Sequence, residues 1–198
     1  MKRVRILMLA FGAISATLIA AQPQQPVLTI AVADRVGLGE QEIRKATQLA
    51  QQIFETAGMP TEFVSCSVVK SGPYFRTECP ATTGPIAVHV HILSKPPADH
   101  KVPPTSAGVA MVGLSGEQGS YLYIYYNRVS RVGVSSSCAT FRVLGHVMAH
   151  EMGHLLGLRH SSWGLMSPNW DTRATKEISV AYLLFSQDEA RMLQRNFR

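Results

Sequence analysis

Apolar residues recur along the chain with two different periods, and the period separates expected strands from expected helices. Alternation of apolar with small or polar residues over 28–32 predicts a half-buried strand. Apolar spacings of three and four predict a helix from Glu40 to about Ala57, where Gly58 and Pro60 end the pattern. Four more extended segments are predicted over residues 63–69, 86–93, 109–114 and 121–126.

Loops and turns separate these extended segments. Residues 94–106 are rich in proline and lack periodicity, which predicts a loop. Gly116 and Gly119 mark the expected turn between the last two extended segments. No internal repeat or second domain boundary interrupts the sequence, so we expect a single compact unit.

Two more helices are expected in the second half of the chain. A broad apolar face predicts a helix from about Thr140 to Leu156, and Gly157 closes it. Ser186 and Glu189 have the spacing of a capping box, which indicates the start of a final helix. The order strand, helix, strands, helix, helix fits a layered α/β domain.

The first 21 residues have the pattern of a secretory signal peptide. Basic residues open the segment, an apolar stretch follows over 6–20, and the small residues Ala20 and Ala21 close it. An uncleaved membrane anchor is the alternative, but the apolar run is shorter than the roughly 20 residues that span a bilayer. We therefore expect a signal peptide over 1–21, one domain over 22–198, a secreted or periplasmic location and no stable membrane insertion.

Composition and charge narrow the possible partners. A hydrophobic content of 46% with 16% charged residues argues against a disordered chain and allows a full core. The formal net charge of +6 includes three cations among the first five residues, and the other lysines and arginines are scattered. The sequence therefore shows neither the basic footprint of a nucleic-acid partner nor a polybasic membrane patch.

Export would place the three cysteines in an oxidising compartment. Cys66 and Cys79 lie in a region rich in serine, glycine and proline, where they could close a short disulfide loop. Cys138 precedes an expected helix, and we expect it to be a small, buried and reduced residue.

The segment from His150 to His160 carries the most informative pattern in the chain. Residues four apart on a helix lie one turn apart on the same side, so His150 and His154 present two imidazoles to one point. Gly157 can adopt the positive φ that ends a helix, which lets the backbone return His160 as a third ligand. Three nitrogen ligands leave a fourth tetrahedral position for water, which is typical of a catalytic zinc site. Glu151 can reach that water as a general base without binding the metal.

His89 and His91 raise the alternative of a second metal site, because they alternate on an expected strand and share one face. Two histidines without further clustered ligands are more often packed or exposed side chains. We therefore expect one catalytic zinc ion and no other cofactor.

A methionine follows the long histidine motif HEMGHLLGLRH at Met166, within the segment 164–168. This combination resembles the metzincin zinc peptidases, in which a methionine-containing turn lies beneath the metal. Ser161, directly after the third histidine, and the segment 185–188 are most similar to the matrixins. Pro168 stands where the astacins and serralysins carry a tyrosine, so a tyrosine ligand is not expected.

The resemblance implies a metzincin-like fold and activity. The fold would be a twisted mixed sheet of about five strands with an active-site helix and a C-terminal helix. An antiparallel edge strand, over 109–114 by element order, would bind an extended peptide beside the zinc. His150, His154 and His160 would hold the zinc, and Glu151 would be the general base of a monomeric endopeptidase that acts on peptides or proteins.

Two other functions use the same residues. A secreted binding or structural domain could retain zinc without turnover, although such a domain has no need of a carboxylate base at Glu151. A zinc hydrolase of non-protein or cell-wall amide bonds would need the same ligands and the same base. The sequence favours the endopeptidase and leaves its substrate open.

Overall fold

The computed structural model describes residues 27–71, 74–82, 84–98, 101–112 and 120–197. The predicted signal peptide over 1–21 and the expected turn at Gly116 and Gly119 lie outside these residues. Within the described ranges, no helix combines the length and the apolar character needed to cross a bilayer.

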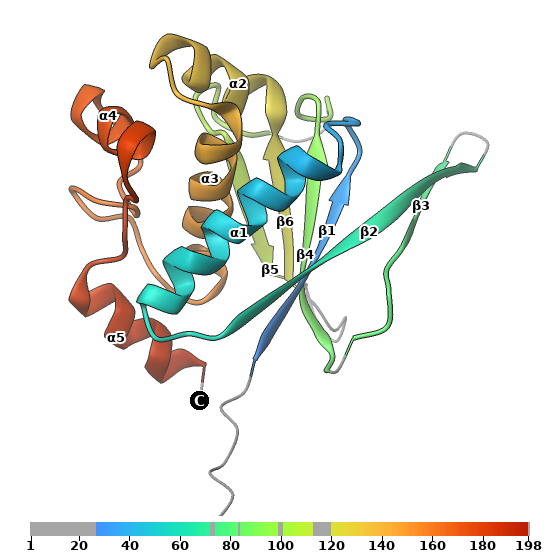
Figure 1. The fold of residues 1–198 in the computed structure, drawn as a ribbon, viewed down its shortest axis with the longest axis horizontal. Coiled ribbons are helices and arrows are strands. Elements are labelled where there is room, and N and C mark those ends of the chain that lie inside the picture. Colours follow the sequence, from blue (N-terminus) through green and yellow to red (C-terminus); the bar gives the residue numbers. More distant parts are fainter. Residues whose placement is uncertain (1–26, 72–73, 83, 99–100, 113–119, 198) are drawn as a thin grey trace, which may run out of the picture.

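A six-stranded mixed sheet forms the centre of the described structure (Figure 1). Its strands are β1 Leu28–Asp34, β2 Thr61–Ser71, β3 Tyr74–Glu78, β4 Ile86–Leu93, β5 Gly108–Val112 and β6 Ser120–Tyr125. The spatial order is β3-β2-β1-β4-β6-β5, and β2, β1, β4 and β6 run parallel. β3 and β5 are the antiparallel edge strands. This sheet confirms the layered α/β fold, with one strand more than the five expected.

Five helices complete the described structure: α1 Glu40–Thr56, α2 Tyr126–Ser135, α3 Thr140–Leu155, α4 Thr172–Val180 and α5 Gln187–Asn196. α1 and α3 cross in front of the sheet, and the β2–β3 hairpin projects away from the helices (Figure 1). Gly145 permits this crossing, because a Cβ there would lie 2.6 Å from the carbonyl oxygen of Ala46 on α1. α5 begins with the predicted capping box of Ser186 and Glu189.

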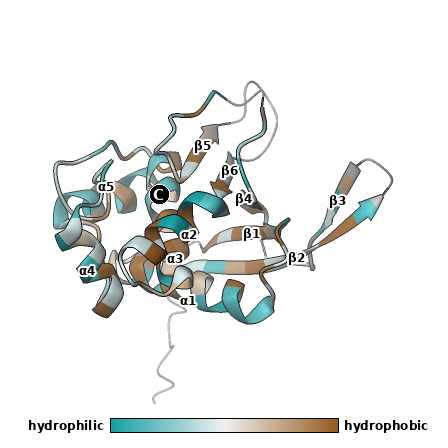
Figure 2. Ribbon diagram, turned by 90° about the horizontal axis from the view of Figure 1, so that it is seen from above, coloured by the Kyte–Doolittle hydropathy of each residue, from teal (hydrophilic) through white to brown (hydrophobic). Residues whose placement is uncertain are grey.

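The core lies between the sheet and the helices α1 and α3. On β4, Val88, Val90 and Ile92 alternate inward and are buried, as expected for a strand with one face on the core. Every residue of α3 from Val143 to Gly153 is buried, so α3 is a core element whose side chains are held by packing. Figure 2 shows hydrophobic residues along the strands and α3, whereas α1 carries hydrophilic stretches on its outer side.

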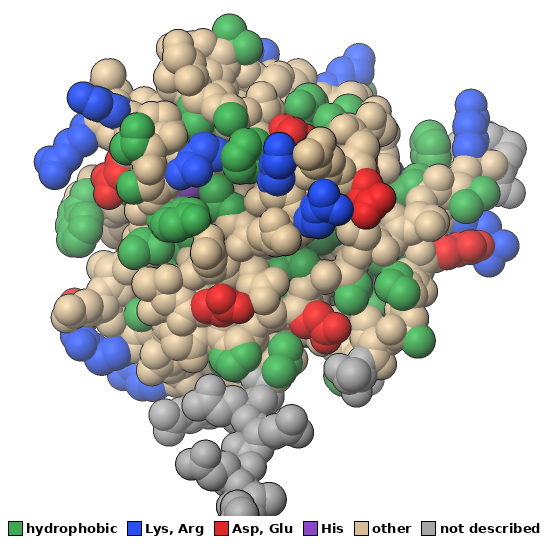
Figure 3. Space-filling model, in the orientation of Figure 1, with side chains coloured by type: hydrophobic (Ala, Val, Ile, Leu, Met, Phe, Trp, Pro, Cys, Tyr) green, Lys and Arg blue, Asp and Glu red, His purple; other side chains and the backbone are tan. Residues whose placement is uncertain are grey.

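Charged side chains are interspersed on the face shown in Figure 3. Lysines and arginines alternate there with acidic and hydrophobic residues and do not form a continuous basic patch on that face. On this face the charges are scattered, as they are along the sequence.

β3, α2 and α4 are absent from the elements that the sequence predicts. The extended segment expected over 121–126 ends one residue early, because Tyr126 begins α2 directly after β6 without a loop. α2 is rich in valine and serine, which have weak helix propensity, so the sequence does not indicate a helix there. α4 has a local signal that could have revealed it, since the Asp171 side chain accepts a hydrogen bond from the Ala174 N–H at 2.8 Å.

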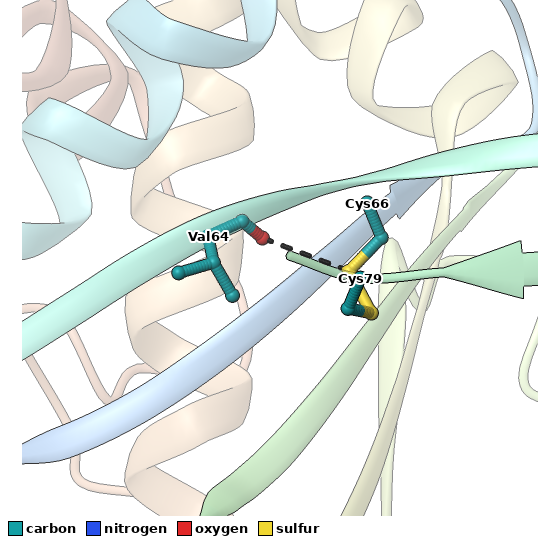
Figure 4. The surroundings of a disulfide bond; sticks show 3 residues. All are labelled: Val64, Cys66 and Cys79. Atoms are coloured by element: carbon teal, nitrogen blue, oxygen red, sulfur yellow. Dashed lines mark hydrogen bonds between the residues drawn. A yellow bond between two sulfur atoms is a disulfide. The ribbon is translucent and has the colours of Figure 1, made fainter. Parts of the chain in front are cut away.

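Cys66 on β2 and Cys79, directly after β3, form the predicted disulfide (Figure 4). The two residues continue the antiparallel register in which Ser67 faces Glu78. The bond therefore closes the inner end of the projecting hairpin. Cys138 is free and buried, as the sequence predicts.

Removing the disulfide should destabilise the protein by about 3 kcal/mol, because a bond across a separation of 13 residues restricts the unfolded chain. Urea denaturation of the wild type and of a Cys66→Ser/Cys79→Ser double variant measures this difference. Reductant should weaken the wild type and leave the double variant unchanged. An unfolding free energy that is the same for both proteins would contradict a stabilising role for the bond.

Candidate metal centre

Helix α3 and the turn after it bring three histidines together. His150 and His154 lie one turn apart on α3, and their ring centroids are 4.8 Å apart. Gly157 follows the helix with a φ of 90°, which confirms the predicted left-handed position. The chain then returns His160, so that Nε2 of His150 and Nε2 of His160 each lie 3.1 Å from Nε2 of His154.

Two of the imidazoles are oriented by backbone carbonyls. Nδ1 of His150 lies 2.7 Å from the carbonyl oxygen of Leu165, and Nδ1 of His154 lies 2.9 Å from that of Leu158. A carbonyl oxygen only accepts hydrogen bonds, so each Nδ1 carries the proton and each Nε2 keeps a free lone pair. Burial lowers the pKa of His150 to about 4, which favours the neutral ring that a metal requires.

The spacing of the three nitrogen atoms fits a zinc ion. Nitrogen ligands at about 2.0–2.1 Å from a tetrahedral zinc lie about 3.3 Å from one another. The two separations of 3.1 Å are close to that value, and all three ligand atoms lie within 4.8 Å of one another. Three nitrogen donors leave a fourth tetrahedral position for water or for a substrate oxygen.

Glu151 lies next to this cluster on α3 and is almost fully buried, with 9% of its surface exposed. Burial raises the pKa of its carboxyl to about 7. A carboxyl with such a pKa can both take and give a proton near neutral pH. Among the described residues, the group suited to hold a metal consists of the three histidines without Glu151, so the carboxylate is available for another role.

The backbone of the edge strand β5 lies closer to Glu151 than it could if residue 108 carried a side chain. A Cβ at Gly108 would lie 2.8 Å from Cγ and 3.0 Å from Oε1 of Glu151. Gly108 is the first residue of β5, and its carbonyl oxygen accepts a hydrogen bond from the Ser106 hydroxyl. Because glycine has no side chain, the backbone of the edge strand can lie directly against the carboxyl group. Sequence reasoning missed Gly108, because no local pattern shows which side chain faces it.

A tight turn after the third histidine passes beneath the cluster. The Ser161 N–H donates to the carbonyl oxygen of Met166 at 3.0 Å, and Met166 is fully buried. A Cβ on Gly153 would lie 2.8 Å from the Met166 sulfur, so Met166 packs directly against the part of α3 that carries His150 and His154. The structure thus places Met166 where the metzincin resemblance implies.

Trp170 supports the cluster directly, and His146 packs beside Trp170, with ring centroids 6.3 Å apart. The Trp170 indole N–H donates to the Leu165 carbonyl oxygen at 3.3 Å, and the same oxygen accepts from His150. His146 is fully buried, and its Nε2 accepts a hydrogen bond from the Leu183 N–H at 3.0 Å. Burial lowers the pKa of His146 to about 4, so the ring stays neutral at neutral pH. His146 lies four residues before His150, so the sequence could have indicated that the two histidines share one face of the helix.

His89 and His91 lie away from this cluster in a stack of aromatic rings. His89 stacks on Tyr121, and His91 stacks on Tyr123, each with ring centroids 5.5 Å apart. Burial lowers the pKa of His91 to about 4. The metal-suited group found among the described residues contains neither histidine, and their contacts are those of packed side chains.

A cleft of about 580 Å³ runs along the histidine cluster and is lined by His150, Glu151 and His160. The loop before β5, the helices α2 and α3, and the chain after Met166 form its walls. The wall residues are 103–107, Arg128, Arg131, Val132, Val143, Val147 and 167–170. The candidate metal site is therefore accessible to a ligand of considerable size.

Comparison with known proteins agrees with this geometry. Residues 88–161, from β4 to the residue after His160, match a family model described as metallopeptidase family M12B, reprolysin-like. A search of curated proteins finds no match. The matched segment contains the three converging histidines. The family match and the histidine cluster together support a zinc metallopeptidase of the metzincin type.

Proposed function

We propose that the chain is a secreted zinc-dependent endopeptidase that hydrolyses peptide bonds with water. The observation that carries the proposal is the convergence of three Nε2 atoms beside a buried carboxyl group. In this proposal His150, His154 and His160 hold the zinc, and Glu151 is the general base. A peptidase of this family implies protein or peptide substrates.

The residues of the cluster have distinct tasks in the reaction. Zinc, when bound, supplies Lewis acidity toward a peptide carbonyl and lowers the pKa of a water molecule. Glu151 takes a proton from the attacking water and delivers it to the leaving amine as the peptide bond breaks. The carbonyls of Leu165 and Leu158 hold the rings of His150 and His154 in their orientations.

The edge strand β5 provides a place for an extended substrate. Among the described residues β5 pairs with β6 on one side, and its other edge has no strand partner. Backbone groups on an open edge can pair with an extended peptide. Because Gly108 contacts Glu151, a peptide on this edge would pass close to the base and to the histidines.

Gly108→Ala should displace the Glu151 carboxyl group and lower kcat about tenfold or more, because small misplacements of a catalytic group are costly. The φ of Gly108 is not in the left-handed region, so alanine adds no backbone strain there. Bound zinc should stay unchanged. Kinetics and elemental analysis of the same sample measure both quantities.

Gly84→Ala is the matched control for this variant, since a Cβ at Gly84 meets no atom within 4 Å. The control should behave as the wild type. Equal kcat values for Gly108→Ala and Gly84→Ala would show that the contact between Gly108 and Glu151 has no role in catalysis.

Secretion and subtype belong to the proposal as well. The Cys66–Cys79 disulfide supports a location in an oxidising compartment. The signal peptide over 1–21 stays a prediction. The matrixin-like subtype also stays a prediction, because the matching family model describes reprolysin-like peptidases.

A peptide-library experiment tests the proposed function. The purified protein should cleave internal peptide bonds, lose this activity with a chelator and regain it with added zinc. Mass spectrometry identifies the cleaved bonds, and a Glu151→Gln preparation made in parallel controls for contaminating proteases. Zinc binding without cleavage of any peptide would contradict the endopeptidase and favour a zinc-retaining binding domain.

A further inference from the structure

One wall of the cleft beside the histidines carries two arginines. The helix α2 presents Arg128, Arg131 and Val132 to the cleft, while Val129 and Gly133 on the same helix are buried. Residues three and four apart share one face of a helix, so the three cleft residues form a continuous surface. This surface faces the space in which a substrate of the histidine cluster would lie.

Arg128 is fixed in place, whereas Arg131 is available to a ligand. The Arg128 guanidinium donates to the carbonyl oxygens of Pro103 and Ser106 and lies 5.3 Å from the ring centre of Tyr125. These contacts hold the loop that precedes β5 against α2. Arg131 is exposed, and among the described residues no hydrogen bond or ion pair holds its side chain.

The charge of these arginines is poorly balanced within the cleft. Among the described residues that line the cleft, Glu151 is the only acidic one, and its carboxyl packs against Gly108 of the edge strand. Val132, Val143 and Trp170 add apolar surface to the walls. Arg131 is exposed, so solvent screens its charge, but two cations on one wall without a nearby described counter-charge still favour an anionic ligand.

We infer that Arg131, supported by Arg128, makes the cleft select peptides that carry a carboxylate on the side of the scissile bond that faces α2. This inference rests on the proposed peptidase function. The carboxylate belongs to an acidic side chain or to the free C-terminus of a short substrate, since both present the same two oxygens to a guanidinium. Arg131 is then a specificity-determining residue of the site.

A charge-swap experiment tests the inference with matched fluorogenic peptides. The peptides carry Glu, Gln or Lys at one position at a time around a cleavage site, and each is made with a free or an amidated C-terminus. At one position, or at the free C-terminus, the wild type should favour the carboxylate about fivefold in kcat/KM at low salt, as expected for an accessible charge pair. Arg131→Gln should remove this preference, and Arg131→Glu should shift it to Lys.

Arg173→Gln is the matched control, because Arg173 is an exposed arginine of α4 that does not line this cleft. It removes the same charge and should keep the preference of the wild type. If Arg173→Gln loses the carboxylate preference to the same extent as Arg131→Gln, net charge alone is responsible. That result would overturn a specific role for Arg131.

A binding measurement separates the inference from the proposed function. With zinc-loaded Glu151→Gln protein, fluorescence anisotropy should show about fivefold tighter binding of the carboxylate peptide than of its Gln or amide counterpart. The free and amidated C-termini identify which carboxylate is recognised. Cleavage of all peptides at equal rates, with equal binding, overturns the inference and leaves the peptidase intact. If no peptide is cleaved, the proposed function fails, and the binding order alone decides whether Arg131 selects carboxylates.

Discussion

Glu151→Gln is expected to abolish peptide cleavage while the zinc stays bound. Glutamine has nearly the shape of glutamate, so it preserves the close contact with Gly108. Its amide cannot take a proton from water, and we expect kcat to fall by about 10²–10⁴-fold. Elemental analysis and peptide cleavage on the same preparation measure the two quantities together.

Glu177→Gln is the matched control, since Glu177 is an exposed residue of α4 outside the histidine-lined cleft. It should keep both zinc and activity. Near-normal turnover by Glu151→Gln would exclude Glu151 as the base. Loss of zinc from the same variant would instead identify Glu151 as a ligand.

Met166→Asp is expected to destabilise the protein by several kcal/mol, about 3 or more, because it buries a carboxylate without a partner. Met166 is fully buried and packs on Gly153 of α3. Met166→Leu has a similar volume and should cost less than about 1.5 kcal/mol. Urea denaturation and zinc analysis of both variants give the comparison.

The two Met166 variants also test whether the turn supports the metal site. Met166→Leu should retain zinc, whereas Met166→Asp should lose zinc along with stability. Unfolding free energies and zinc contents that are equal in the wild type and both variants would place Met166 outside the apolar layer beneath His150 and His154.

The histidine cluster could be predicted because its geometry depends on local spacing. His150 and His154 are four residues apart within a mostly apolar segment that forms a helix, and both the spacing and the apolar residues can be read from the sequence. Gly157 ends that helix with the expected positive φ, which returns His160 to the other two. The capping box at the start of α5 was predictable for the same reason.

The contact between Gly108 and Glu151 could not be predicted, because it depends on tertiary packing. The two residues are far apart in sequence and meet only where β5 pairs with β6 and α3 lies across the sheet. The role of Arg128 likewise requires α2, a short helix that is rich in valine and serine and whose N-cap makes no side-chain hydrogen bond. The sequence predicts elements that are long or carry a motif of their own. It does not predict contacts that form only when distant elements pack together.

The central claim is that zinc held by three histidines is required for peptide hydrolysis, and titration of zinc into chelated protein tests it most directly. The cleavage rate should rise in proportion to bound zinc and level off at about one zinc per chain. His154→Ala, which removes the imidazole whose Nε2 lies 3.1 Å from both others, should neither retain zinc nor cleave peptides. Cleavage that persists in the zinc-free protein, or saturation with zinc that produces no cleavage, would contradict the claim.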